Sequence, residues 1–191
     1  MSQEDRAVTP VVSTILMVVL VVILAATTSV AFFTFTENIN EPAPIVGDTT
    51  GEFEAGGELD QQLVRIKHIA GEDIAVEDLE IIVRVSGPSL DTEARLVDLP
   101  TDSFFSTAID SSNIQGDDSI IDTRSSAPNQ IIVPADSNMW TAGDTIQFRI
   151  SVSGADFRDP PKGNNPKADQ LEVIIVHTPS NAIISENTFR P

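Results

Sequence analysis

An uncharged run of 30 residues, AVTPVVSTILMVVLVVILAATTSVAFFTFT, extends from Ala7 to Thr36. As an α-helix it would be about 45 Å long, whereas a bilayer core needs only about 20 residues. The run is rich in Val, Ile and Thr, but a lone strand cannot satisfy its backbone hydrogen bonds in lipid. The 15 Val, Ile, Leu and Phe side chains between Val11 and Phe35 favour the membrane by roughly 5–9 kcal/mol. The sequence therefore predicts a long apolar helix that can span a membrane.

Three fates of this helix are compatible with its position near Met1. It can be an uncleaved signal anchor, or a secretory signal peptide cut after Ala31, since Ser29 and Ala31 are small. It can also follow a short leader that is cut off before the apolar run, as in pilin precursors. The leader MSQEDR carries a net charge of −1, and the run is about twice the usual length of a signal-peptide core, which disfavours the secretory alternative.

The start of the chain resembles a known family. The matching segments are RAVTPVVS at residues 6–13, ILMV at 15–18 and VILAA at 22–26. They resemble the N-terminal signature of archaeal type IV pilins, with Thr9 in place of the usual Ser and Ser13 in place of the usual Gly. The segment lacks the Gly-Ile-Gly-Thr pattern of archaellins and the Glu of bacterial pilins.

The resemblance implies a defined maturation and assembly. A membrane-bound prepilin peptidase would cut between Ala7 and Val8, next to Arg6, and remove the leader 1–7. The helix 8–38 would stay on the product and pass from the membrane into the core of a surface filament. Copies of the same chain, an assembly ATPase and a membrane platform are the implied partners, and attachment or cell–cell contact is the implied role. The residues expected to pack in the filament core are Val11, Ile15, Val18, Val22, Ala25, Ala26 and Ser29.

Charge and composition narrow the function of the remaining chain. The 191 residues hold 29 acidic and 11 basic side chains, and from Glu37 onward the net charge is −17. Such a surface disfavours nucleic-acid binding, because phosphates need Lys and Arg partners. It is typical of adaptation to concentrated salt and therefore of a halophile, although recruitment of a cationic partner is the alternative. The absence of Cys excludes disulfides, thiol catalysis and Cys-ligated metals.

The pattern after the helix predicts an all-β, antiparallel sandwich. Pro42, Pro44, Gly47 and Gly51 suggest a linker over 39–51, followed by an acidic extracellular β-domain over 52–191. Side chains alternate between apolar and polar in several stretches, and seven to nine short strands are expected. A four-residue turn at 178–181 predicts a closing hairpin. The expected strands are 64–67, 79–85, 130–133, 145–153, 171–177 and 182–189.

No pattern in the sequence indicates catalysis. The two histidines, His68 and His177, are expected to be hydrogen-bonded at strand ends, and Trp140 is expected in the core. The polar loop 110–118 lacks the EF-hand spacing, and loop 156–169 is expected to be a surface excursion. We therefore predict a structural protein without metal or cofactor, with a membrane-tethered binding module that does not polymerise as the alternative.

Overall fold

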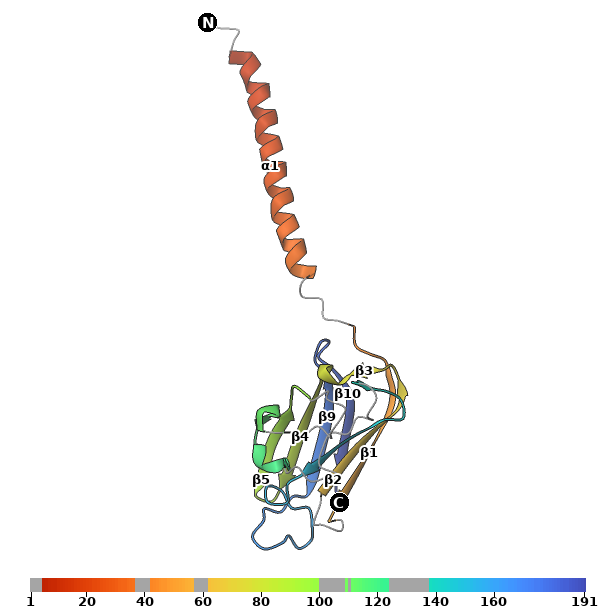
Figure 1. The fold of residues 1–191 in the computed structure, drawn as a ribbon. Helices are drawn as coiled ribbons and strands as arrows, with labels where there is room; N and C mark the ends of the chain where they lie inside the picture. Colours follow the sequence, from red (N-terminus) through yellow and green to blue (C-terminus); the bar gives the residue numbers. More distant parts are fainter. Residues whose placement is uncertain (1–4, 37–41, 57–61, 100–108, 110, 124–137) are drawn as a thin grey trace. The chain divides into compact units, whose positions relative to one another are not determined.

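The computed structural model describes residues 5–36, 42–56, 62–99, 109, 111–123 and 138–191. The chain divides into two compact units, Met1–Glu41 and Pro42–Pro191, and the second is called the β-domain below. The first unit contains helix α1, Asp5–Thr36, which confirms the predicted long apolar helix (Figure 1). Its observed range differs by a few residues from the expected 8–38, of which 37 and 38 lie outside the described residues.

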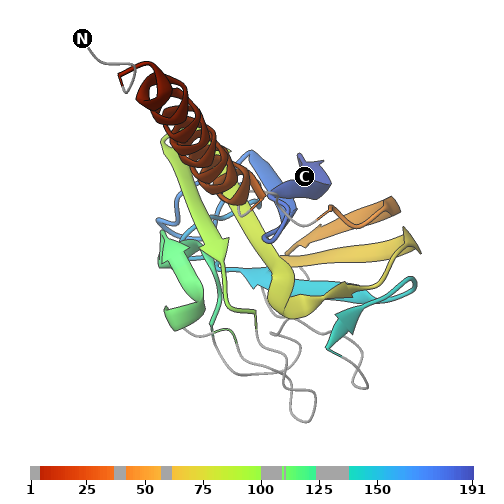
Figure 2. The ribbon, with the colours of Figure 1, turned by 90° about the horizontal axis from the view of Figure 1, so that it is seen from above.

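The β-domain is built from antiparallel strands, as predicted. The strands are β1 Val46–Ala55, β2 Gln62–Gly71, β3 Ile74–Ala75, β4 Leu79–Gly87, β5 Leu90–Leu96, β6 Ile114–Gly116, β7 Met139–Trp140, β8 Thr145–Ile150, β9 Gln170–His177 and β10 Ala182–Phe189. One sheet has the order β1-β2-β8, a second has the order β10-β9-β4-β5-β6, and β3 pairs with β7. Figure 2 shows the first two as separate layers. In the described part of the chain, short 3-10 helices at Val76–Asp78, Ser111–Asn113 and Asp118–Ile120 lie between strands.

The core lies between the two larger sheets and follows the alternation in the sequence. In β4 every second residue from Leu79 to Val85 is buried, because successive side chains of a strand point to opposite faces. Val64 and Ile66 of β2 are buried in the same cluster. This confirms the expected inner faces of 64–67 and 79–85. Other members of the cluster are Ile81, Val83, Ile146, Phe148, Leu171, Val173 and Ile175.

The predicted closing hairpin is also present. Strands β9 and β10 pair from Ala182 opposite His177 to Phe189 opposite Leu171. The turn between them ends at Asn181, whose φ of 55° is in the left-handed region that Asn tolerates.

The linker prediction is wrong from Val46 onward, because β1 already pairs with Gly71 of β2 there. Two glycines and three acidic side chains disguise this strand in the sequence. Gly51 lies where β1 meets β10: a β-carbon there would collide with Asn187 and Phe189. The glycine therefore lies in a close packing contact between β1 and the side chains of β10, inside a strand and not in a linker.

The expected strand 145–153 is too long at its end. Strand β8 stops at Ile150, and the amide groups of Gly154 and Ala155 donate to the carbonyl oxygen of Ser151 in a turn. Alternation continues through the turn by chance, since Val152 is flanked by two serines. The expected strand 130–133 lies outside the described residues.

Candidate assembly helix and the acidic β-domain

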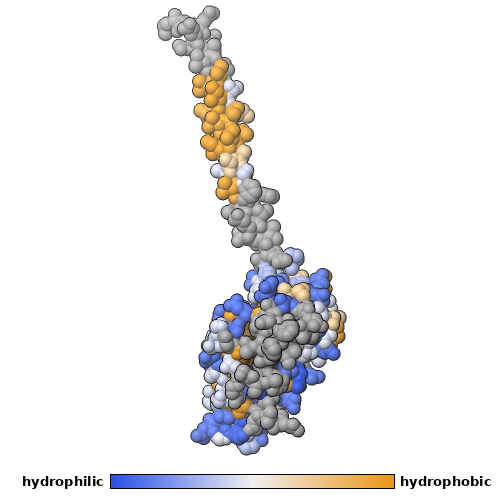
Figure 3. Space-filling model, in the orientation of Figure 1, coloured by the Kyte–Doolittle hydropathy of each residue, from blue (hydrophilic) through white to orange (hydrophobic). Residues whose placement is uncertain are grey.

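Helix α1 exposes apolar side chains on all sides. Within the described residues, the segment Val11–Ala31 is long and apolar enough to cross a membrane, and none of it is buried inside the protein. Figure 3 shows that the visible surface of this segment is mostly apolar. A soluble helix normally keeps one polar face, whereas a helix that is apolar all round is buried on all sides. A single partner that covered one stripe of this helix would leave its other apolar side chains exposed to water. The helix therefore needs lipid or several neighbouring helices around it.

The seven residues expected to pack in a filament core share one face of this helix. Successive residues of an α-helix are turned by about 100°, which places all seven within an arc of about 100°. They are exposed in the single chain, so the face is available to a partner. Larger side chains on the opposite face border a groove, in which Ser13 provides the small side chain. The groove is lined by Val12, Ser13, Leu16, Met17, Leu20, Val21 and Leu24.

Four hydroxyl groups in the described part of the helix, those of Thr14, Thr27, Thr28 and Ser29, are hydrogen-bonded within the helix itself. Thr14 Oγ1 donates to the carbonyl oxygen of Val11 at 2.8 Å, and Ser29 Oγ donates to that of Ala25 at 2.8 Å. Thr27 and Thr28 bond in the same way to carbonyls one turn earlier. Each hydroxyl therefore enters an apolar environment already paired, which removes most of the cost of burying it.

The expected processing residues Arg6, Ala7 and Val8 lie in the first turns of α1. The structure describes the backbone there and not the side chains. Pro10 also lies early in the helix, where a missing amide hydrogen costs little. Cleavage between Ala7 and Val8 remains a prediction.

The comparison with known families bears on this same segment. Residues 6–47 match the family model described as archaeal type IV pilin, N-terminal. This match includes α1 from its second residue, so it supports the resemblance drawn from residues 6–26. Type IV pilins are structural subunits that polymerise with the help of membrane machinery. The match ends at residue 47, before most of the β-domain, and no curated protein matches the chain.

Both histidines are hydrogen-bonded, as expected, but only His177 ends a strand, since His68 lies within β2. His68 Nδ1 lies 3.3 Å from the carbonyl oxygen of Trp140, with the two rings 4.9 Å apart between centroids. His177 Nδ1 lies 2.7 Å from Ser180 Oγ. Trp140 is fully buried, which confirms its place in the core. Among the described residues, no group of His, Asp and Glu could hold a metal ion.

Sequence reasoning missed a buried carboxylate that organises the loop after β8. Asp156 is 0% exposed and accepts hydrogen bonds from Arg158 Nη2 at 2.6 Å and Arg158 Nε at 2.8 Å. Lys162 N and Asn165 Nδ2 donate to the same carboxylate at 2.8 and 3.2 Å. Burial alone would raise the pKa of Asp156, but these hydrogen bonds outweigh it and hold the pKa well below its usual value. The spacing Asp-x-Arg was the available signal in the sequence.

A second missed pair lies at the end of β8. Arg149 and Asp122 are almost completely buried, with 2.9 Å between Arg149 Nη2 and Asp122 Oδ2. Arg149 occupies a polar position of an alternating strand, so the sequence predicted exposure. Segment 120–122 instead pairs with the open edge of β8, where Ser151 N donates to the carbonyl of Ile120 and Asp122 N to that of Arg149.

The outer face of the five-stranded sheet carries an exposed ion-pair network. Arg84 Nε lies 2.7 Å from Glu93, and Arg95 lies 2.9 Å from the other oxygen of Glu93. Hydrogen bonds from Arg84 and then Arg95 lower the pKa of Glu93. Arg84 also reaches Glu172, and Arg95 reaches Glu80. The network links β5, β4 and β9 through four contacts between arginine and glutamate side chains on an otherwise acidic surface.

Proposed function

We propose that this chain is a subunit of an archaeal type IV pilus-like surface filament. The observation that carries the proposal is α1: a helix with the pilin N-terminal match whose apolar surface finds no cover within the described chain. The precursor would be held in the membrane by this helix, with the β-domain outside the cell. After cleavage, helices from many copies would pack together and the β-domains would form the outer layer.

The face formed by Val11, Ile15, Val18 and Val22 and continued by Ala25, Ala26 and Ser29 would make the close helix contacts. Small residues let helix backbones approach, and the intrahelical hydroxyl bonds leave no unpaired donor at the contact. The opposite, larger face would contact further copies or residual lipid. The chain would depend on a prepilin peptidase, an assembly ATPase and a membrane platform, and the filament would serve adhesion or cell–cell contact.

The acidic surface of the β-domain would suit a high-salt exterior. A net charge of −17 from Glu37 onward keeps the domain soluble, and concentrated salt would screen its self-repulsion. This supports an origin in a halophile as part of the same proposal.

Mass spectrometry of the mature chain combined with electron microscopy of sheared surface material tests the proposal. We expect an N-terminus at Val8 and filaments that contain this chain. An intact Met1 on a monomeric membrane protein would favour the alternative, a tethered binding module that does not polymerise. A mature N-terminus at Phe32 would contradict both, because the helix would be lost.

A further inference from the structure

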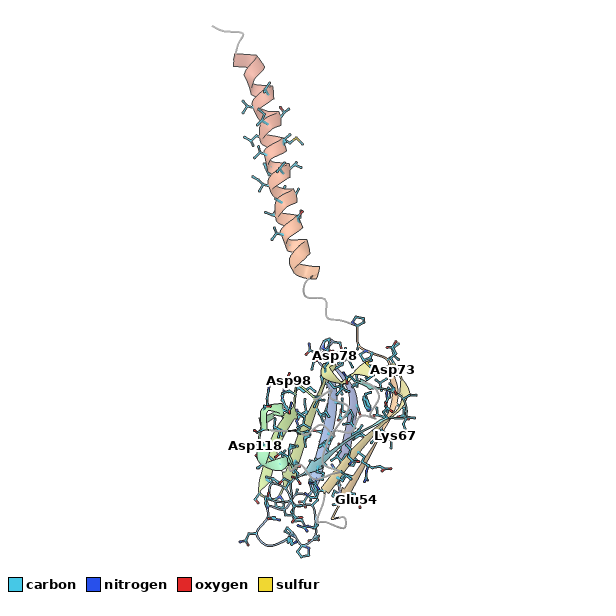
Figure 4. The ribbon with its side chains drawn as sticks, in the orientation of Figure 1. Glu54, Lys67, Asp73, Asp78, Asp98 and Asp118 are labelled. Carbon is cyan, nitrogen blue, oxygen red and sulfur yellow. The ribbon has the colours of Figure 1, made fainter. Side chains whose placement is uncertain are left out.

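A polar pocket of about 680 Å³ lies at one end of the β-domain. Strand β2 joins the two ends: Gly71 pairs with Val46, where the chain enters, and Gln62 pairs with Ile150 at the other end of the sandwich. The pocket follows Ile150 and is therefore at the end away from chain entry. Figure 4 labels Asp118, which belongs to one wall. The lining residues fall into a first wall within 118–123, a floor at 151–153, and a second wall with Lys162 and Asn165.

The first wall is held rigidly. Asp117 accepts hydrogen bonds from Ser119 N at 3.0 Å and from Ser119 Oγ at 2.6 Å, and this fixes the 3-10 helix at 118–120. Asp122, at the end of the wall, is fixed by its ion pair with buried Arg149. Gly154 packs so closely on the carbonyl oxygen of Ser119 that a β-carbon would collide with it. The first wall and the floor are thus one packed unit.

The second wall is held by the buried carboxylate of Asp156. Its hydrogen bonds to the amide of Lys162 and to the side chain of Asn165 set the position of both pocket residues. Two buried ionic clusters, Asp156 with Arg158 and Asp122 with Arg149, therefore support one pocket from opposite sides. Buried ion pairs are poor stabilisers, because desolvation offsets their attraction, so their use here points to positioning.

The chemistry of the lining selects a ligand class. The pocket presents serine and threonine hydroxyls, two carboxylates, one ammonium and one amide, so donors and acceptors are mixed. Among the described lining residues, Asp122 is paired with Arg149, and Asp118 and Lys162 carry opposite charges, so this part of the lining has no strong preference for an anion or a cation. Among the described lining residues only Ile121 and Val152 are apolar, too few for a lipid chain or an amphipathic helix. A ligand whose many hydroxyls both donate and accept fits best.

We propose that this pocket binds a neutral oligosaccharide. Its walls are preorganised, several lining side chains are exposed, and its volume is in the range of small-ligand sites. Such a site would give the filament a ligand for adhesion. The inference rests on the proposed function only in that the pocket would be displayed on a filament.

Full-length protein in detergent micelles, screened on a printed array of neutral and acidic oligosaccharides, tests the proposal. We expect binding to at least one neutral oligosaccharide, with a Kd near the millimolar range for the free sugar. Asp118→Ala and Ser153→Trp should each weaken it by about tenfold or more, the first by removing an acceptor and the second by filling the pocket. Asp73→Ala and Thr188→Trp make comparable changes, to an aspartate and to a small hydroxyl residue, at exposed positions outside the pocket and should leave binding unchanged.

Thermal melting of each variant shows whether it is folded. The proposal would be overturned if no neutral oligosaccharide on the array bound the protein. It would also be overturned if both pocket variants were folded and still bound the sugar as the wild type does. Filament formation by the wild type is scored separately. Filaments without sugar binding would contradict this inference alone, whereas sugar binding without filaments would support it and contradict the proposed function.

Discussion

Helix α1 and the β-domain use the same residue types in opposite ways. Val22 of α1 is 59% exposed, whereas Val83 of β4 is 0% exposed. The β-domain buries its own Val, Ile and Leu side chains between two sheets, so its core is complete within one chain. The helix buries none of its apolar segment. The apolar side chains of the helix therefore need an apolar environment, either lipid or other helices, that a single copy of the chain does not provide.

Charge divides the two regions as sharply. Residues 7–36 carry no charge, and the chain from Glu37 onward carries −17. One region is suited to lipid or a helix bundle, the other to water. Substitutions at equally exposed positions in the two regions test whether exposure has a different meaning in each.

The largest effect is expected from a charge placed in the helix. Val22→Asp and Ile183→Asp change side chains that are 59% and 61% exposed. A charge at the centre of an apolar helix costs about 3 kcal/mol on insertion and leaves an unpaired carboxylate in a helix bundle. We expect Val22→Asp to abolish membrane insertion or filament formation, measured by cell fractionation and electron microscopy.

Ile183→Asp is the matched control, because its position already faces water. The variant should assemble normally, and its free energy of unfolding should lie within about 0.5 kcal/mol of the wild-type value. Equal behaviour of the two variants would show that exposure in α1 means no more than exposure on the β-domain.

The reverse comparison uses truncation. Ile81→Ala removes a fully buried side chain from β4 and should lower the free energy of unfolding of the β-domain by about 2–5 kcal/mol. Val22→Ala should leave that free energy unchanged, since the helix lies outside this core. Thermal or urea unfolding of full-length protein in detergent, followed by Trp140 fluorescence, measures both. A similar loss in both variants would show that the two units share one core.

These features divide into those that sequence could predict and those that it could not. The helix, the inner face of β4 and the β9–β10 hairpin follow from local periodicity and turn chemistry. Strand β1 was missed because its glycines imitate a linker, whereas Gly51 packs against side chains of β10, which is distant in sequence. The pairs around Asp156 and Arg149 were missed because burial of a charge depends on neighbours from other segments.

In the assembly site, the shared face of the seven helix residues could be derived from spacing alone. The far-end pocket could not, since its walls come from segments about 40 residues apart that meet only in the folded sandwich. Alternation between 145 and 153 also misled, because two serines in a turn imitate the polar face of a strand.

A smaller but specific effect is expected at Asp156. Asp156→Asn keeps the shape but removes the charge that binds Arg158, and should destabilise the β-domain by about 3 kcal/mol. Asp159→Asn removes an 85% exposed partner of Lys167 in the same loop and should cost about 0.5 kcal/mol or less. Urea unfolding at neutral pH compares them, and equal losses would contradict the buried role of Asp156.

The pH dependence follows from the same carboxylate. The pKa of Asp156 is lower in the folded than in the unfolded chain, so its stabilisation is present above the unfolded pKa of about 4 and is lost as pH falls below it. Between about pH 5 and pH 2, wild type should therefore lose stability more steeply than Asp156→Asn. Parallel stability curves for the two proteins would contradict this assignment.

The smallest effect is expected from salt. Molar NaCl shortens the screening length to about 3 Å, which should relieve repulsion in the β-domain and raise its stability by about 1 kcal/mol. Replacing exposed Asp73, Asp118 and Glu186 by their amides should reduce this gain. If salt stabilised the amide variant as much as the wild type, the salt effect would come from the core and not from the surface charge.

The central claim is that α1 stays on the mature chain and is covered by other copies of itself. A cryo-electron microscopy reconstruction of filaments sheared from cells that produce this chain tests it most directly. We expect a filament core of packed α1 helices that begin at Val8, with Val11, Ile15, Val18 and Val22 in contact with neighbouring helices. A filament joined only through β-domains, or helices that remain separate in the membrane with no polymer, would contradict it.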